Sequence, residues 1–419
     1  MSIEWKETEL GKIAFTTSGG TPSRKNENYY SGGTIPWVKS GELEFGTITK
    51  TEEFITQAGI DNSSSKIFPK GTLLIALYGA TIGKLSFLGI DAATNQAVCG
   101  IFENDTVDLK YLYYFLLFQR PNLVRQGIGG AQPNISQTIL KKLMVPYPKE
   151  KSEQERIVAK IEELFSELDN GVETLKKIKQ QLAVYRQAVL KEAFEGKFTA
   201  HIPCDVELSW ASEEETKSLP AIPKEWQYIA LSNLGDLGRG KSKHRPRNDP
   251  KLFEGGKYPF LQTGEVKAAK QYITEYSKMY GEFGLQQSKL WPKGTLCITI
   301  AANIAETAFL GIDACFPDSV VGFTPYAHII PEYIKYFIES QKLRLWAFAP
   351  ATAQKNINLD TLENLIVPYC SVEEQQLVIA EIEARMTICD SIEQTVGIAL
   401  QQAEAMRQSI LKKAFEGEL

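Results

Sequence analysis

The chain has 419 residues, of which 43% are hydrophobic and 23% charged, an ordinary composition for a globular protein of two or three domains. Its net charge of −5 argues against binding of nucleic acid by bulk charge, but leaves room for a local basic surface. No run of about twenty apolar residues predicts a membrane span and no secretion signal opens the chain, so we expect a cytoplasmic protein.

The six cysteines do not predict a metal site or a redox motif. None of them lies in a Cys-x-x-Cys pair, and the three histidines are far apart in the sequence. Zinc sites normally combine such residues at close spacing. We therefore expect reduced thiols and no metal ion in this chain.

The first part of the chain mixes strand and helix patterns. Apolar runs at residues 72–77 and 85–88 predict two strands around a glycine-rich turn. Residues 108–119 predict a helix, and residues 127–132 predict a loop. This mixture favours an α+β domain, which we call the first head.

Residues 153–198 predict one long helix. Apolar residues recur there at alternating steps of three and four, and the positions between them are mostly Glu, Lys and Gln. The apolar stripe comprises Ile157, Ile161, Leu164, Leu168, Val172, Leu175, Ile178, Leu182, Tyr185 and Val189. A helix of about 40 residues is roughly 60 Å long, too long for one globular core, so its stripe needs a long partner.

The partner lies in the same chain, because residues 374–419 repeat the pattern of residues 153–198. In this overlay Asp169 matches Asp390, and Arg186 matches Arg407. We expect the two helices to pair antiparallel, around an internal pseudo-twofold axis.

The second helix has the weaker stripe. Arg385 and Glu393 replace Leu164 and Val172, so we expect looser or wetter packing at those positions.

The repeat extends through both heads. Residues 40–42 (Ser-Gly-Glu) match residues 263–265 (Thr-Gly-Glu), and an Ala-Phe-Glu-Gly sequence closes each long helix. Residues 331–342 predict the second copy of the head's helix. The whole chain is therefore a head followed by a long helix, written twice.

Residues 199–225 connect the two copies. They contain three prolines and a run of three glutamates, and predict an acidic, mostly extended linker. The expected segments are residues 1–148 (first head), 149–198 (first long helix), 199–225 (linker), 226–367 (second head) and 368–419 (second long helix).

Residues 235–242 fit the phosphate-loop pattern of Gly, four residues, then Gly-Lys-Ser. That loop binds phosphates only when a helix follows it, and Pro246 and Pro250 oppose a helix here. We therefore expect no nucleotide-binding role for this segment.

The same stretch is strongly basic. Its cations are Arg239, Lys241, Lys243, Arg245, Arg247 and Lys251. They are either contacts for a nucleic-acid backbone and base edges or a solvated, flexible loop. Because the first head carries Arg24 and Lys25 in its equivalent loop, we favour the nucleic-acid contacts.

The turn at residues 78–83 and the segment around Asn303 occupy equivalent places in the two heads but share almost no sequence. Variable loops on a shared scaffold suggest two heads that do the same job on different targets, although ordinary drift after duplication gives the same pattern.

No catalytic motif of a methyltransferase, helicase or nuclease is recognisable in the sequence. We therefore expect a protein that binds rather than catalyses.

This arrangement resembles the specificity subunit of type I restriction–modification systems, over essentially the whole chain. The motifs that carry the resemblance lie at residues 18–22 (Ser-Gly-Gly-Thr-Pro), 35–38 (Ile-Pro-Trp-Val), 79–83 (Gly-Ala-Thr-Ile-Gly), 93–97 (Ala-Thr-Asn-Gln-Ala) and 130–136 (Gly-Ala-Gln-Pro-Asn-Ile-Ser). The second head departs from them, notably at residues 302–304.

The resemblance implies a fold of two tandem target recognition domains of mixed α/β structure, separated by two long antiparallel coiled-coil helices. Each head would read one half of a bipartite, asymmetric sequence in double-stranded DNA. The helices would set the gap between the halves and dock modification subunits, two of them, with restriction subunits also in the complex. Adenosylmethionine, ATP and magnesium would belong to these partners, and this chain would hold no cofactor.

The loops and the resemblance together select the candidate DNA-binding residues. In the first head they are Thr21, Arg24, Lys25, Asn26, Lys39, Tyr78, Thr81 and Lys84, and in the second head Arg239, Lys241, Lys243, Arg245, Arg247, Gln262 and Asn303. The alternatives are a two-headed coiled-coil scaffold that binds only proteins, or a fused restriction or methylation enzyme, which the missing motifs disfavour.

Overall fold

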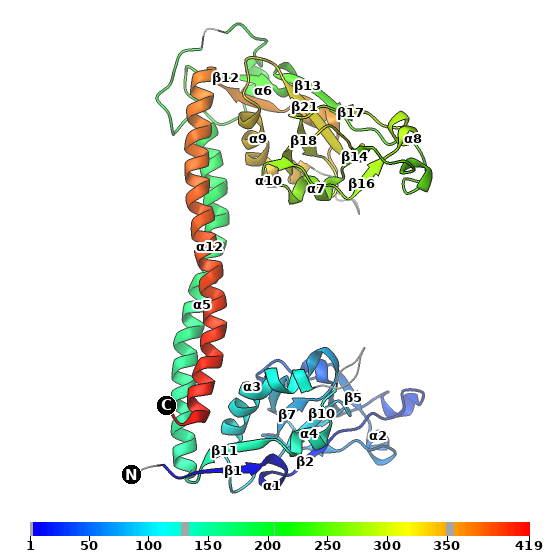
Figure 1. Cartoon of the computed structure of the whole chain (residues 1–419), viewed down its shortest axis with the longest axis vertical. Coiled ribbons are helices and arrows are strands. Elements are labelled where there is room, and N and C mark those ends of the chain that lie inside the picture. The colour runs from blue at the N-terminus through cyan, green and yellow to red at the C-terminus, as the bar shows by residue number, and fades with distance from the viewer. Residues whose placement is uncertain (1–2, 127–133, 205, 349–355) are drawn as a thin grey trace. The chain divides into compact units, whose positions relative to one another are not determined.

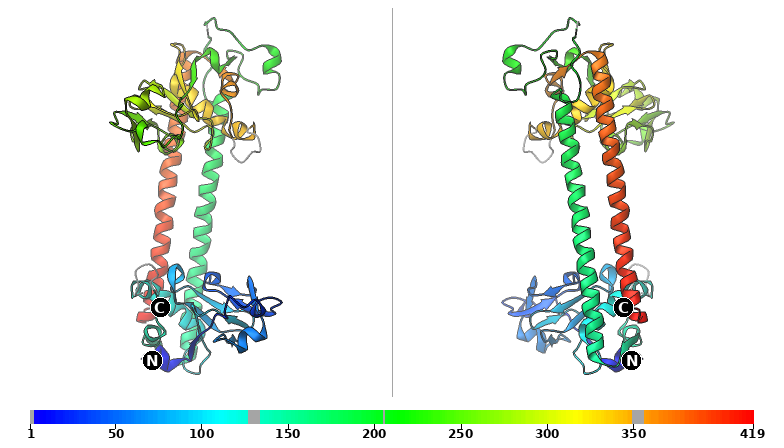
Figure 2. Two further views of the ribbon diagram at one scale, coloured as in Figure 1. Left: turned by 90° about the vertical axis from the view of Figure 1, so that its right-hand side faces the viewer. Right: turned by 90° about the vertical axis from the view of Figure 1, so that its left-hand side faces the viewer.

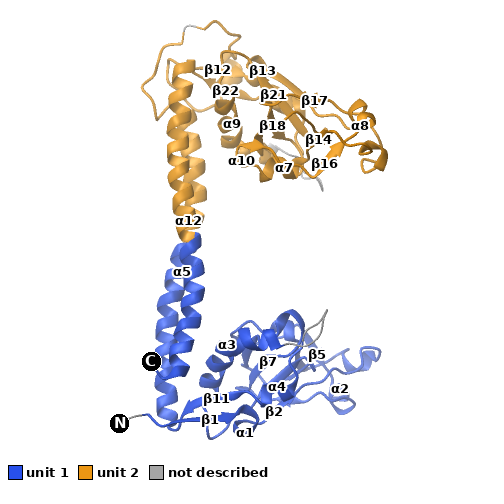
Figure 3. Cartoon of the chain, viewed as in Figure 1, with its two compact units in different colours: residues 1–176, 397–419 blue, residues 177–396 orange. Residues whose placement is uncertain are grey.

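The computed structural model describes residues 3–126, 134–204, 206–348 and 356–419. It contains two compact units, shown in two colours in Figure 3. Unit 1 comprises residues 1–176 and 397–419, and unit 2 comprises residues 177–396. Each unit therefore combines one head with parts of both long helices.

Unit 1 contains three sheets (Figure 1). Its strands are β1 (Trp5–Glu9), β2 (Thr16–Ser18), β3 (Ile35–Val38), β4 (Thr47–Ile48), β5 (Glu53–Ile55), β6 (Ile67–Phe68), β7 (Leu73–Ala76), β8 (Leu85–Leu88), β9 (Ala92–Thr94), β10 (Val98–Ile101) and β11 (Met144–Pro148). The sheet orders are β1-β11, β2-β10-β7-β8-β4 and β5-β3-β9-β6. Its short helices are α1 (Leu10–Ile13), η1 (Glu27–Tyr29), η2 (Ser40–Glu42), α2 (Gln57–Asp61), η3 (Gly79–Thr81) and α4 (Gln137–Lys141), and its longer helix is α3 (Leu109–Gln126).

Unit 2 repeats this topology strand for strand. Its strands are β12 (Gln227–Ala230), β13 (Gly235–Arg239), β14 (Tyr258–Phe260), β15 (Tyr272–Ile273), β16 (Lys278–Tyr280), β17 (Leu290–Trp291), β18 (Leu296–Thr299), β19 (Thr307–Leu310), β20 (Ala314–Cys315), β21 (Val320–Pro325) and β22 (Ile366–Tyr369). The orders are β12-β22, β13-β21-β18-β19-β15 and β16-β14-β20-β17. Its helices are α6 (Glu213–Thr216), η4 (Leu231–Asn233), η5 (Pro250–Leu252), α7 (Thr263–Ala268), α8 (Glu282–Gln286), α9 (Pro331–Ser340), α10 (Lys342–Phe348) and α11 (Leu359–Glu363). The predicted α+β heads and their internal repeat are confirmed.

The long helices are α5 (Lys151–Phe194) and α12 (Val372–Glu416), and they pair antiparallel in each unit (Figure 2). In unit 1, Arg407 of α12 forms an ion pair with Asp169 of α5. In unit 2, Arg186 of α5 binds Asp390 of α12 at 2.6 Å. These two pairs are the residues that match in the sequence overlay, so the repeat in sequence is also a repeat in contacts.

The Ala-Phe-Glu-Gly sequence that closes each long helix has a packing role. The Phe415 ring lies 5.2 Å from the Tyr111 ring and 5.3 Å from the Phe115 ring, inside the core of unit 1. Phe194 makes the equivalent contacts in unit 2, at 5.0 Å from Tyr333 and 5.2 Å from Phe337. Burial of each phenylalanine stabilises its unit by about 1.5–3 kcal/mol.

The predicted apolar stripe of α5 is wrong at Tyr185, and it omits Phe165. Tyr185 is 45% exposed, while Phe165, which lies off the predicted stripe, is buried. Phe165 packs against Tyr114 of α3 at 5.9 Å and under the Arg407 guanidinium at 5.0 Å. The partner surface of α5 therefore includes the head, and not only the other helix.

Polar contacts occur where the second helix replaces apolar residues. Glu393 lies 3.3 Å from Arg186, and the Arg385 guanidinium lies 4.2 Å from the centre of the Phe198 ring. Charged side chains therefore make specific contacts at the positions where the first helix has apolar residues.

Three local predictions compare with the structure as follows. The helix predicted over 108–119 runs to Gln126 and passes through Pro121, with Leu123 buried beyond the proline. The linker 199–225, predicted to be mostly extended, contains the four-residue helix α6, and its Trp210 forms an isolated β-bridge with Ile229. The loop predicted over 127–132 lies outside the described residues.

Candidate nucleic-acid interface

The two basic loops begin at the same place in both heads, beside the strand of the five-stranded sheet that neighbours β2 or β13. The Gly19 N–H donates to the Val98 carbonyl oxygen at 3.1 Å, and the Gly240 N–H donates to that of Val320 at 2.9 Å. A Cβ at Gly240 would lie only 2.3 Å from the Phe316 carbonyl oxygen. This glycine therefore permits close backbone packing.

The segment that fits the phosphate-loop pattern, residues 235–242, does not form a phosphate loop. Residues 235–239 form strand β13, whose hydrogen bonds pair with β21. The next helical element is the three-residue turn η5, and not an α-helix. The segment therefore lacks the helix amino end that a phosphate loop uses.

In unit 2, Asp318 in the turn before β21 holds two arginines of the basic loop. One guanidinium nitrogen of Arg247 donates to both carboxylate oxygens of Asp318, at 2.8 and 3.0 Å. The Arg239 Nε donates to the Asp318 carbonyl oxygen at 3.1 Å. The turn thus fixes where this part of the loop lies.

A second contact organises the middle of the same loop. His244 lies 2.8 Å from the Asp249 carboxylate, and this hydrogen bond lowers the pKa of Asp249. The only acidic residue of the basic stretch is therefore already engaged by the loop itself.

Other cations of this loop remain available. The side chains of Lys241, Lys243 and Arg245 are exposed, and none has an acidic partner within the described residues. Arg245 donates only to the carbonyl oxygens of Ser242 and His244, at 2.5 and 2.9 Å. Three positive charges therefore face solvent on one short loop.

A pocket of about 280 Å³ lies next to this loop and brings Arg247 together with Gln262. Its lining residues are Ser242, Arg247, Phe260, Gln262, Thr263, Gly264, Pro317 and Ser319. They come from the basic loop, the junction of β14 with α7, and the turn before β21. Three segments far apart in sequence thus converge at one polar site.

In the first head the equivalent loop also contacts the turn before β10, but with different side chains. The Thr21 hydroxyl donates to Gln96, which precedes β10. Arg24 binds Glu53 at 2.7 Å, and its guanidinium lies 4.5 Å from the Tyr30 ring centre. The bond from Arg24 lowers the pKa of Glu53.

Two further candidate cations of the first head are Lys39 and Lys25. The Lys39 ammonium lies 3.0 Å from both Glu52 and Glu53. Lys25 is exposed and has no acidic partner in the part of the chain that the structure describes. The Asn26 side chain accepts a hydrogen bond from the Asn28 N–H at 3.2 Å and so caps η1, which is a local structural role.

The other predicted residues lie on a different turn. Tyr78, Thr81 and Lys84 belong to the connection between β7 and β8, where the Thr81 hydroxyl donates to the Tyr78 carbonyl oxygen at 2.8 Å. Asn303 occupies the equivalent turn of unit 2, and its side chain lies 3.5 Å from the Lys267 ammonium. None of these four residues lines the pockets beside Lys39 or Gln262.

Sequence reasoning missed the acidic side chains that orient the cations. Asp318 and Glu53 are far in sequence from the arginines that they bind, so no local sequence pattern predicts these ion pairs. Glu42 and Glu265 were visible, because the repeated Ser/Thr-Gly-Glu pattern contains them, but their role follows only from their hydrogen bonds.

The described residues show no group of three or more His, Cys, Asp or Glu side chains that could hold a metal ion. All six cysteines are free, and five are buried. Burial raises the pKa of the Cys99 thiol to about 12.

Among the helices that the structure describes, none is both long and apolar enough to cross a membrane.

Known proteins share both the sequence pattern and the fold of this chain. A family model described as the type I restriction modification DNA specificity domain matches residues 2–183 and again residues 223–402. The specificity subunit of the type I restriction enzyme EcoBI from Escherichia coli is 26% identical over 336 residues, covering 78% of this chain and 69% of that protein. The EcoDI specificity subunit from the same species is 24% identical and covers 100% of this chain and 89% of its own length.

A solved structure concerned with complex assembly and conformational transition of the type I R-M system contains a chain of the same fold. It superposes with a TM-score of 0.75 at 18% identity, covering 100% of both chains. The fold class predicted from the sequence is thereby confirmed.

The chain belongs to the type I restriction–modification DNA specificity family. It is a non-catalytic specificity subunit, and the family match favours a DNA-recognition subunit over a scaffold that binds only proteins.

Proposed function

We propose that each head of this chain reads one half of a bipartite sequence in double-stranded DNA, through the loop that follows β2 in unit 1 and β13 in unit 2. Exposed cations of the loops contact phosphates, which positions the protein without reading sequence. The polar pockets beside the loops contact base edges and supply the specificity.

The observation that carries this proposal is that the same three segments contact one another in both heads. In unit 2 the glycine-anchored loop, the start of α7 and the turn before β21 line one pocket. In unit 1 the start of η2 and the turn before β10 line a pocket, and the loop meets the same turn through the Thr21–Gln96 hydrogen bond. The backbone framework is shared, whereas the side chains differ between the heads. A pair of readers for two unlike half-sites requires this combination.

The long helices have a separate role in the proposal. They set the gap between the half-sites and dock two modification subunits, and restriction subunits join the same assembly in the cytoplasm. The modification subunits bring adenosylmethionine for methyl transfer, and the restriction subunits bring ATP and magnesium. This chain determines which DNA sequence the assembly binds.

The test is DNA binding by the full chain over a series of salt concentrations. The logarithm of the association constant should fall linearly with the logarithm of salt concentration, by about 0.9 for each phosphate contact. Replacing Lys241, Lys243 and Arg245 together by Ala should reduce the steepness of this line by about 2.7.

Lys224→Ala is the matched control, because the Lys224 side chain is 91% exposed in the linker and lies outside both loops. This variant should leave the slope unchanged. Weak binding with no salt dependence would contradict the proposal and favour a scaffold that binds proteins.

A further inference from the structure

Lys39 of the first head and Gln262 of the second head occupy equivalent backbone positions. Lys39 in unit 1 and Gln262 in unit 2 each stand immediately before the short helix that follows β3 or β14. The Lys39 N–H donates to Glu42 Oε1 at 2.8 Å, and the Gln262 N–H donates to Glu265 Oε2 at 3.0 Å. The glutamate three residues later thus fixes the backbone of both positions.

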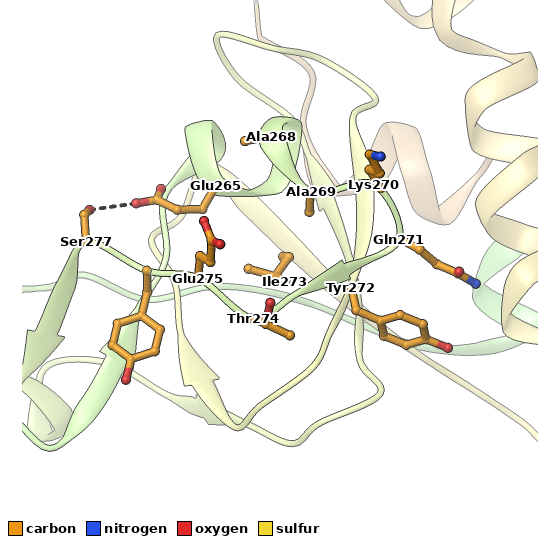
Figure 4. A pocket seen from close by; sticks show the side chains of 11 residues that line it. Glu265, Ala268, Ala269, Lys270, Gln271, Tyr272, Ile273, Thr274, Glu275 and Ser277 are labelled. Carbon is orange, nitrogen blue, oxygen red and sulfur yellow. Dashed lines mark hydrogen bonds between the residues drawn. The ribbon is translucent and has the colours of Figure 1, made fainter. Parts of the chain in front are cut away.

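Each glutamate is itself held from a second segment. Glu42 Oε2 accepts hydrogen bonds from the Thr51 hydroxyl at 2.9 Å and from the Glu52 N–H at 3.2 Å. Glu265 Oε1 accepts from the Ser277 hydroxyl at 2.7 Å, the dashed line in Figure 4, at the edge of a pocket of about 650 Å³. In both heads, therefore, the glutamate carboxylate connects the start of the short helix to a segment about ten residues further along the chain.

The side chains at the two braced positions have different chemistry. Gln262 is exposed and lines the 280 Å³ pocket together with Arg247. A glutamine amide both donates and accepts, so it can pair with N6 and N7 of adenine in the major groove.

Lys39 can only donate. Its ammonium already binds Glu52 and Glu53 at 3.0 Å each, which leaves one of three N–H groups for a ligand. It lines a pocket of about 910 Å³ that also includes Asn95. Because two carboxylates compensate its charge, it is better suited to a directed bond with guanine O6 or N7 than to a phosphate contact.

We propose that residues 39 and 262 are the equivalent specificity-determining positions of the two heads. Gln262 reads an adenine in one half-site, and Lys39 reads a guanine in the other. Glu42 and Glu265 are the positioning residues that hold them. This inference rests on the proposed function.

The test exchanges the two side chains in the full chain and selects bound duplexes from a random DNA library. Gln262→Lys should change one base pair of one half-site from adenine to guanine and leave the other half-site unchanged. Lys39→Gln should change one guanine of the other half-site to adenine. Each variant should bind the wild-type target about 5- to 150-fold more weakly.

The unchanged half-site serves as the internal control in each selection. If Gln262→Lys keeps the wild-type sequence in both halves, or alters both halves, the assignment is wrong. If the wild-type chain selects no sequence at all, the proposed function fails instead, so the two failures are distinguishable.

The positioning role has its own test. Glu265→Ala should relax discrimination at the Gln262-dependent base pair while the salt slope stays the same, because no phosphate contact is lost. Glu265→Gln should restore most of the discrimination, since its amide oxygen can still accept from the Gln262 N–H. Equal loss of affinity for every duplex in both variants would indicate a merely structural role and overturn the assignment.

Discussion

The matched ion pairs between the long helices give a prediction about what fixes their register. In unit 1, Arg407 binds Asp169 and lies over the Phe165 ring. In unit 2, Arg186 binds Asp390 and lies 3.7 Å from the Met386 sulfur. We expect that Arg407→Glu or Arg186→Glu destabilises the unit that contains it.

The magnitude follows from exposure and geometry. The two arginine side chains are 26% and 25% exposed, whereas their aspartate partners are 59% and 73% exposed. A partly exposed pair contributes at most about 1 kcal/mol, and the contact of Arg407 with Phe165 adds about 0.5–1 kcal/mol. Reversal also introduces repulsion, most strongly at position 186, where an acidic side chain would face Asp390 and Glu393. The expected loss is about 1–2 kcal/mol for each variant.

Thermal unfolding followed by calorimetry measures this loss. For a unit of about 200 residues, each kcal/mol lowers Tm by about 2–4 °C, so a fall of about 2–8 °C is expected. High salt should reduce the effect, because the charges are partly exposed. Combining Arg186→Glu with Asp390→Arg should recover most of the lost Tm.

Lys176→Glu is the control for charge reversal on α5, because Lys176 is exposed and has no ion pair among the described residues. If this control lowers Tm as much as Arg186→Glu, or if the charge-swapped double variant stays destabilised, the pairs do not set the register.

Three further predictions concern spacing, thiols and pH. Adding seven residues to both α5 and α12 should lengthen the tolerated gap between half-sites without changing either half, as measured with duplexes of graded gap; altered half-sites would contradict the spacer role. Cys204 is the one partly exposed cysteine and should react with a maleimide long before the buried thiols. Cys99 is one of these, and burial raises its pKa to about 12. Mass spectrometry of the labelled peptides measures the order of reaction, and any other order would contradict the prediction. Arg24 lowers the pKa of Glu53 in the folded chain, so their ion pair stabilises unit 1 above the ordinary glutamate pKa near 4.5, and this stabilisation is lost as the pH falls through the lower folded pKa. Glu53→Gln should therefore reduce the difference in the stability of unit 1 between pH 6 and pH 3. An unchanged pH profile of stability would show that the ion pair contributes nothing.

Much of this protein is legible in its sequence because the relevant signals are local or repeated. The spacing of apolar residues determines the long helices, since a 3.6-residue turn places them on one face whatever lies opposite. The duplicated order of motifs determines that there are two heads of one topology. The positive charges of residues 239–251 mark a candidate contact loop before any fold is known.

Tertiary structure decided which of these side chains act together. Arg247 meets Gln262 only because the basic loop and the start of α7 converge, and Arg24 of the first loop forms an ion pair with Glu53 of β5. Tyr185 follows the apolar pattern and yet is exposed. Phe165 breaks the pattern and is buried, because α3 of the head packs against it. Helical periodicity depends on neighbours a few residues away, but the engagement of a charge depends on which distant segment folds against it.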